Sequence, residues 1–191
     1  MRLRLCAIAV MMVFMTSACA AKSPDWQTYA STAGNFAVLA PGSFQEAAQT
    51  NDTAIGKIES HTFVLDRGSI GYFVSYSDFP ADAMQTANAD AALESGVKGA
   101  LDNLKATQVN KGDITLDGAP GKEVQGDIAS GSTFPNGGVV KARAYLVANR
   151  LYQVYVLVKK GSEADAQMDR YIQSFRFLTA PKSENSPEPA P

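Results

Sequence analysis

The sequence predicts an α+β fold in which antiparallel strands alternate with two helices. Short apolar runs are joined by tight turns, which favours antiparallel pairing of consecutive strands. Two segments carry apolar residues at helical spacing on one stripe each, as expected for helices that pack on a sheet. A hydrophobic share of 46% and a charged share of 19% are typical of a soluble globular protein and exclude a disordered, fibrous or polytopic membrane chain.

Residues 1–20 have the pattern of a secretion signal. Two arginines precede an apolar run, Leu5–Met15, which is too short to span a bilayer as a helix. Residues 16–19 (Thr-Ser-Ala-Cys) resemble a bacterial lipobox, in which Cys19 becomes the lipidated first residue, although Thr stands where Leu is usual. The alternative is cleavage after Ala20 by the small-x-small rule. Both predict an exported protein, periplasmic or at the outer face of a membrane. Only the lipobox interpretation gives membrane contact, through the lipid on Cys19.

The numbers of cysteine, histidine and charged residues limit the chemistry and the partners that this chain can have. Cys6 is lost with the signal, so the exported chain keeps at most one cysteine and can form neither an internal disulfide nor a cysteine nucleophile in its folded body. With one histidine, a Cys/His metal site is excluded, and we expect no metal and no cofactor. Loss of two arginines leaves 15 basic and 19 acidic residues, a charge of about −4. We therefore expect no nucleic-acid partner.

The exported chain is predicted to hold a short tether (21–25), one domain (26–178) and a disordered proline-rich tail (179–191). Apolar residues from Leu93 to Leu104 predict a first helix, with Asn88 as N-cap and a Glu94–Lys98 pair. Strands are expected on either side of it, and these are 36–40, 55–65, 70–76, 107–116, 122–128, 139–147 and 151–158. A final helix, 163–175, is expected to begin at a capping-box-like Ser162 and Asp165.

The last hairpin is predicted to have a three-residue loop, 148–150. That register places Leu146 opposite Tyr152 and makes an apolar face of Val140, Ala142, Ala144 and Leu146. The opposite face then holds Arg143 across from Tyr155.

Several segments resemble the PsbP-like domains, which are grouped with the Mog-type Ran-binding proteins as α/β/α sandwiches. They occur in the family's order and cover almost all of residues 26–178; they are 34–41 (GNFAVLAP), 71–80 (GYFVSYSDFP), 118–123 (GAPGKE), 144–152 (AYLVANRLY) and 172–177 (IQSFRF). The resemblance implies a twisted antiparallel sheet with helices on its faces. It also implies a non-enzymatic binding or assembly module, exported in many bacterial members and often as a lipoprotein. It implies no site residue, because the ion-binding residues of the photosystem protein have no match here.

The remaining candidates are a binding surface and isolated polar groups. Lys141, Arg143, Tyr145 and Tyr155 predict a basic-aromatic patch on the hairpin, because arginine and aromatic side chains anchor interfaces. The alternative is that the final helix packs over this face, so that the aromatic side chains belong to the core. Phe134 adds an aromatic side chain in the glycine-rich loop 129–138, beside that patch. His61 shares a strand face with charged residues, which favours a solvated position over a general base or a metal ligand.

Three functions remain open at this stage. The first is an exported envelope binding or assembly module without catalytic activity, whose partner is an envelope protein or a small ligand. The second is a small-ligand carrier, which needs an apolar cavity of about 300 Å³ or more. The third is a carboxylate-dependent hydrolase, which needs two carboxylates within about 5–10 Å in a pocket.

Overall fold

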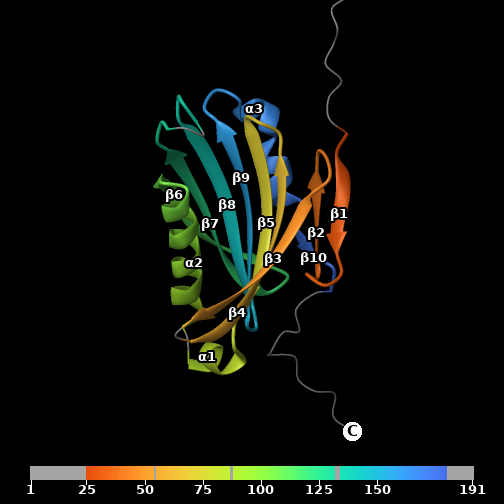
Figure 1. Cartoon of the computed structure of the whole chain (residues 1–191), viewed down its shortest axis with the longest axis vertical. Helices are drawn as coiled ribbons and strands as arrows, with labels where there is room; N and C mark the ends of the chain where they lie inside the picture. The colour runs from red at the N-terminus through yellow and green to blue at the C-terminus, as the bar shows by residue number, and fades with distance from the viewer. Residues whose placement is uncertain (1–24, 54, 87, 132–133, 180–191) are drawn as a thin grey trace, which may run out of the picture.

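The computed structural model describes residues 25–53, 55–86, 88–131 and 134–179 (Figure 1). The predicted signal, Cys19, and the tail from residue 180 onward lie outside the described residues. At the C-terminal boundary, Thr179 exchanges two hydrogen bonds with the side chain of Asn35, at 3.0 and 3.1 Å.

The described residues form two antiparallel sheets. The larger sheet holds, in spatial order, β3 (Gln45–Thr53), β4 (Gly56–Asp66), β5 (Ile70–Asp78), β9 (Arg150–Lys159), β8 (Gly138–Val147), β7 (Ala119–Ile128) and β6 (Ala106–Leu116). The smaller sheet holds β1 (Gln27–Ser31), β2 (Phe36–Ala40) and β10 (Arg176–Phe177), with β2 in the centre. Because β10 pairs with β2, the two ends of the described chain lie in one sheet.

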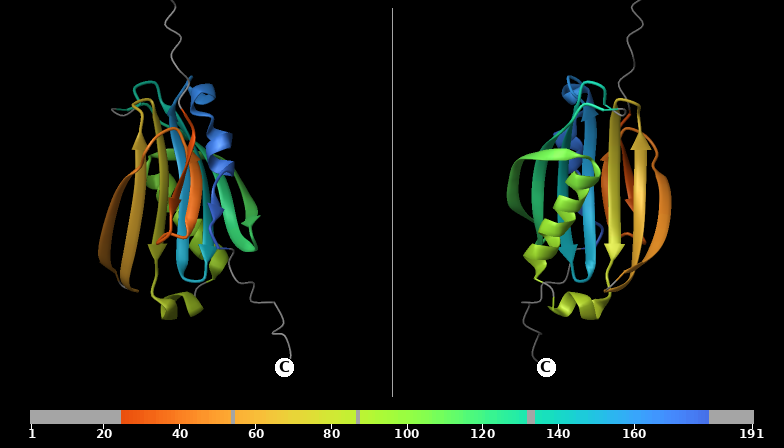
Figure 2. Two further views of the ribbon diagram at one scale, coloured as in Figure 1. Left: turned by 90° about the vertical axis from the view of Figure 1, so that its right-hand side faces the viewer. Right: turned by 60° about the vertical axis from the view of Figure 1, so that its left-hand side comes forward.

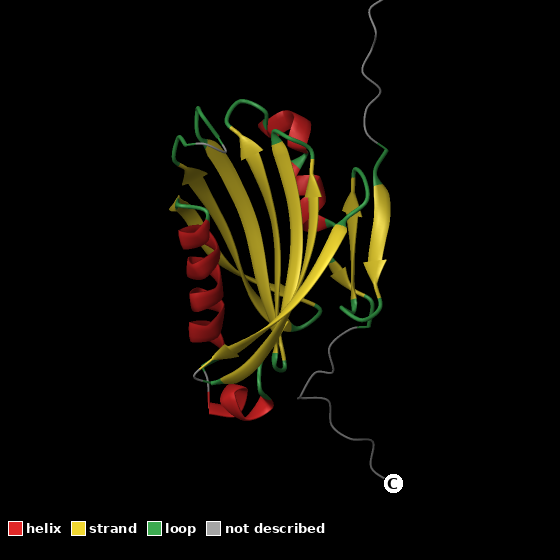
Figure 3. Cartoon of the chain, viewed as in Figure 1, coloured by secondary structure: helices red, strands yellow, loops and turns green. Residues whose placement is uncertain are grey.

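Helices cover both faces of the larger sheet, as Figures 2 and 3 show. On one face α2 (Ala89–Asn103) packs on β6, β7, β8 and β9. On the other face α3 (Glu163–Ala166) and α4 (Met168–Gln173) pack beside the smaller sheet. A short α1 (Ala81–Thr86) closes one end. The predicted α+β class and the antiparallel sheet between helices are confirmed.

The two faces have separate apolar cores. Under α2 lie Leu93, Val97 and Leu101 of the helix against β8 and β9. Under α3 and α4 lies a core rich in tyrosine and phenylalanine, to which both sheets contribute. The residues predicted for the inner hairpin face are buried as expected, and these are Val140, Ala142, Ala144 and Leu146. Asn88 caps α2 as predicted, because its side chain accepts hydrogen bonds from the N–H groups of Asp90 and Ala91.

The predicted register of the last hairpin is wrong by one residue. Leu146 pairs with Leu151 and Val147 with Arg150, so the loop has two residues, 148 and 149. Ala148 takes the left-handed backbone conformation, with φ of 52°, that such a short hairpin loop requires. Alternation could not fix the register here because both faces of β8 and β9 are covered and both therefore carry apolar residues.

The predicted final helix is also corrected. It is broken at Gln167, which adopts φ 45° and ψ 49°, so α3 and α4 are separate short helices. Ser162 makes no side-chain capping bond to α3. In α2, Glu94 binds Lys111 rather than Lys98, and Lys98 pairs with Asp102. The elements missed by the sequence prediction are β1, β3, β10 and α1.

Candidate functional site

The five predicted binding residues do not form one surface. Lys141, Arg143 and Tyr145 point to the face of α3 and α4, whereas Tyr155 lies on the α2 face and stacks on Phe73 with ring centroids 4.8 Å apart. The predicted pairing of Arg143 with Tyr155 is therefore wrong, since Val154 stands opposite Arg143. Arg143 instead binds Glu123 on β7, at 2.6 Å from Nε to Oε2.

Tyr145 and Phe134 belong to the interior. Tyr145 is 2% exposed and stacks on Phe175 at 5.7 Å, with Phe177 edge-on at 6.1 Å. Burial raises the pKa of the Tyr145 phenol above its usual range. Phe134 is buried under the far end of α2, where it lines a pocket of about 310 Å³ together with Leu104 and Leu157.

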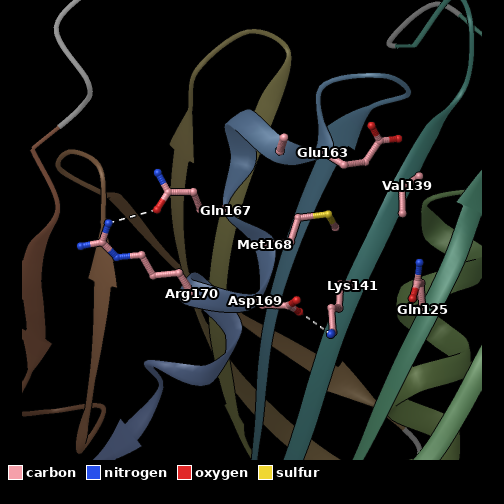
Figure 4. A pocket seen from close by; sticks show the side chains of 9 residues that line it. Gln125, Val139, Lys141, Glu163, Gln167, Met168, Asp169 and Arg170 are labelled. Carbon is pink, nitrogen blue, oxygen red and sulfur yellow. Dashed lines mark hydrogen bonds and ion pairs between the residues drawn. The ribbon is translucent and has the colours of Figure 1, made fainter.

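Lys141 lines a polar groove between β7–β8 and the α3–α4 segment (Figure 4). The groove has a volume of about 580 Å³ and is lined mainly by polar side chains. Its charges neutralise one another, because Lys141 binds Asp169 at 2.6 Å and lies 3.8 Å from Glu123. The left-handed Gln167 accepts a hydrogen bond from Arg170 across the groove wall, at 3.0 Å. The charge of Lys141 is therefore already paired within the protein and is not free to bind a charged ligand.

A second pocket, which we call the apolar pocket, opens between α1, α2 and the turn end of the β8–β9 hairpin. It has a volume of about 400 Å³, and its lining residues are Ile55, Phe79, Ala83, Met84, Ala92, Ser95, Gly96, Leu146 and Leu151. At its rim Ile55 leaves 52% of its surface exposed, although isoleucine is usually buried. A concave apolar surface with few polar groups is the usual form of a binding site.

Three local features fix the positions of the elements around the apolar pocket. Gly96 lets α2 lie close to the sheet, because a Cβ there would come within 2.9 Å of the Leu151 side chain. Gln153 donates a hydrogen bond to the Gly96 carbonyl at 3.0 Å, which ties the middle of α2 to β9. Below the helix, the Asn149 side chain donates to the Phe79 carbonyl at 2.7 Å, and the Phe79 N–H donates to the Asn149 carbonyl at 2.9 Å.

Several carboxylates of the described residues are engaged in ion pairs, most closely around Lys122. Lys122 is a buried cation on β7 that binds Asp113 at 2.6 Å and contacts Glu94 at 3.3 Å; it also binds Asp90 at 2.5 Å. Hydrogen bonds from Lys111 and Lys122 lower the pKa of Glu94, and a hydrogen bond from Lys122 lowers the pKa of Asp113. A general acid needs the opposite shift, so these groups are suited to holding α2 on β6 and β7 rather than to proton transfer.

His61 is half-buried rather than solvated as the strand pattern predicted. Its ring stacks on Tyr76 with centroids 4.5 Å apart, and its Nε2 lies 2.9 Å from Glu59. In the described part of the chain, no group of three or more His, Cys, Asp or Glu side chains is placed to hold a metal ion.

The comparisons with known proteins concern the fold. The solution structure of cyanobacterial PsbP (CyanoP) from Synechocystis sp. PCC 6803 matches with a TM-score of 0.53. The match covers 85% of this chain and 98% of that chain, at 14% sequence identity. The chain has a PsbP-like fold.

A further solved structure of similar outline is a protein of unknown function from Pseudomonas aeruginosa, described as a putative regulator. It covers 73% of this chain and 86% of its own length, at 6% identity and a TM-score of 0.38. No family model and no curated protein sequence matches the chain. Among the described residues of this PsbP-like chain, no helix has the length and apolar character needed to cross a membrane.

Sequence reasoning missed the apolar pocket, and it grouped residues that the structure places on opposite faces of the larger sheet. The pocket joins residues from the turn before β4, from α1, α2 and the last hairpin, which are far apart in the sequence. One local signal was present, since a glycine in the interior of an amphipathic helix often marks close packing. Gly96 is such a glycine.

Proposed function

We propose that the protein is an exported binding module of the cell envelope without catalytic activity, and that it holds an apolar side chain of a partner protein in the apolar pocket. The observation that carries this proposal is the pocket itself, with apolar walls and the exposed Ile55 at its rim. Apolar surface left in water is unfavourable by about 25 cal/mol per Å², so covering it by a partner stabilises the complex.

The catalytic alternative has less support. Among the carboxyl groups whose pKa departs from its ordinary range, Glu94, Asp113 and Glu163 are all shifted downward. For Glu163 the cause is a hydrogen bond from the Gly161 N–H at 2.9 Å. A glycoside-type hydrolase needs one carboxyl with a raised pKa to protonate the leaving group. A binding role requires no such group.

We place the module at the membrane through a lipid on Cys19, as the lipobox-like segment predicts. Replacing Cys19 with serine removes the thiol that carries the lipid. The variant is expected to move from the membrane fraction to the soluble fraction, as measured by fractionation and immunoblotting. An intact mass of the natural protein that begins at unmodified Ala21 would contradict the anchor.

Filling the apolar pocket with a large side chain tests whether the partner binds there. Ser95 is exposed on α2 and lines the apolar pocket. In Ser95→Trp the indole ring is expected to fill the mouth of the pocket. Recovery of the partner from the envelope should then fall at least about tenfold, as it does when a central anchor residue of an interface is lost. Lys98→Trp is the matched control, because Lys98 is exposed on the same helix, does not line the pocket and makes an exposed ion pair of little energetic value. Both variants should unfold within about 0.5 kcal/mol of the natural protein. Equal partner recovery with the two variants would overturn the proposed position.

A small-ligand carrier is the second candidate, and one observation favours it. The apolar pocket has a volume of about 400 Å³, within the range that holds a small molecule. Extraction of the purified natural protein with organic solvent, followed by mass spectrometry, distinguishes a small-ligand carrier from a module that binds a partner protein. A stoichiometric apolar compound that Ser95→Trp lacks would favour the carrier.

A further inference from the structure

The two edges of the larger sheet differ in how they are protected. An edge strand exposes unpaired N–H and C=O groups, and proteins usually protect such edges with bulges, prolines, lysines or a covering element. At one edge, β6 has a register shift between Gln108 and Asn110, and its Lys111 is bonded to Glu94 of α2 at 2.7 Å. That edge is irregular and partly covered.

The opposite edge, β3, has none of these devices. Its sequence, residues 45–53 (QEAAQTNDT), contains no proline, lysine or arginine. All nine residues are exposed, and the pairing with β4 runs without a break from Gln45↔Val64 to Thr53↔Gly56. In an antiparallel pair, alternate residues point their N–H and C=O groups away from the partner strand. The free side of β3 is therefore a regular template nine residues long.

The two faces of β3 differ in charge. One face carries Glu46 and Asp52 with the small Ala48 and Thr50 between them, and Glu59 of β4 stands opposite Thr50. The acidic side chains of this face are 55% to 83% exposed. Lys57 lies 3.8 Å from Asp52, and the His61 ring lies 2.9 Å from Glu59 and 3.7 Å from Glu46. The other face holds neutral side chains, which are Gln45, Ala47, Gln49 and Asn51.

The acidic face of β3 favours a basic strand over a second copy of β3 as its pairing partner. Full overlap of β3 with β3 of a second copy would set Glu46 opposite Asp52 at both ends, and like charges opposite each other are destabilising. A strand with Lys or Arg at alternate positions would instead place opposite charge beside Glu46 and Asp52, with Glu59 one strand further in. We propose that β3 docks an extended basic segment of a partner protein as an added strand of the sheet. The inference rests on the proposed function, since it names the chemistry of the partner.

The probe for this proposal is a nine-residue synthetic peptide in which lysine alternates with threonine. Control peptides replace the central threonine with proline, which removes a strand hydrogen bond, or all lysines with glutamate. Binding is measured by calorimetry on the processed protein purified from the envelope. The lysine peptide is expected to bind at least about tenfold more tightly than either control. Amide exchange should slow at alternate residues of β3 and stay unchanged in β6.

A matched pair of variants separates strand docking from general charge attraction. Glu46→Lys with Asp52→Lys is expected to weaken the lysine peptide at least about tenfold. Asp25→Lys with Asp127→Lys makes the same change in net charge at exposed residues away from β3, and should leave binding nearly unchanged. Equal binding of the proline peptide, equal effects of the two variants, protection in β6, or dimerisation through β3 would each overturn the proposal.

The Ser95→Trp variant distinguishes failure of the β3 docking proposal from failure of the proposed function. Ser95→Trp alters the apolar pocket and should leave binding of the lysine peptide unchanged. If the β3 variant alone has no effect while Ser95→Trp loses the partner, the edge proposal falls and the pocket stands.

Discussion

Replacing Tyr145 with alanine is expected to lower the free energy of unfolding by about 3–5 kcal/mol. The ring is 2% exposed and is enclosed by Phe175 and Phe177, which the C-terminal segment brings to it. Removing it leaves a cavity at the point where α4, β10 and the larger sheet meet. Since whole domains are stable by about 5–15 kcal/mol, this is a large part of the total. Urea unfolding followed by fluorescence or circular dichroism measures the change.

Tyr145→Phe is the control for that variant. It keeps the stacked ring and removes only the hydroxyl, so the expected loss is within about 1.5 kcal/mol. If Tyr145→Ala unfolds at nearly the same urea concentration as the natural protein, the ring is not core. The hairpin would then present Tyr145 to solvent, as the binding-patch interpretation of the sequence requires.

Alkaline pH is expected to unfold the protein through its tyrosines. All seven tyrosines of the chain have raised pKa values, chiefly because burial disfavours the phenolate. The pKa of Tyr72 is raised to about 12, and that of Tyr171 lies well above 10. Between about pH 10 and these values, the unfolded chain loses phenolic protons that the folded chain keeps. Stability therefore falls as pH rises through that window and is not affected by these groups below it.

Phenolate absorbance tests this directly. In the natural protein the absorbance should rise only above pH 10 and together with loss of the folded circular dichroism signal. In guanidinium chloride the seven phenols should titrate near pH 10. A phenol that ionises near pH 10 while the protein stays folded would contradict the buried aromatic core.

The parts of the fold that were predictable depend on local signals. The α2 helix was predicted because one face is apolar at helical spacing and Asn88 supplies a cap. The β3 strand was missed because both of its faces are exposed, so its sequence has no alternation and few residues that favour strands. The break at Gln167 was missed because the apolar stripe of the segment continues through it.

The predicted placement of Tyr155 on the same face as Arg143 was wrong because of a single step in register. Lys141, Arg143 and Tyr145 share a face in any register, because they alternate along one strand. The face of Tyr155 relative to them depends on loop length, and a shift of one residue moves it to the other side. The sequence contains no feature that decides between two and three loop residues when both faces are apolar. The apolar pocket depends on contacts between distant segments, which no local pattern encodes.

Site-specific photocrosslinking from position 95 in intact cell envelopes tests the central claim most directly. A photoreactive residue at Ser95 faces the mouth of the apolar pocket, and the same residue at Lys98 lies on the same helix but does not line it. We predict one protein adduct of defined mass from position 95 that position 98 does not give. Absence of that adduct, or an identical adduct pattern from both positions, would contradict a binding module that uses the apolar pocket.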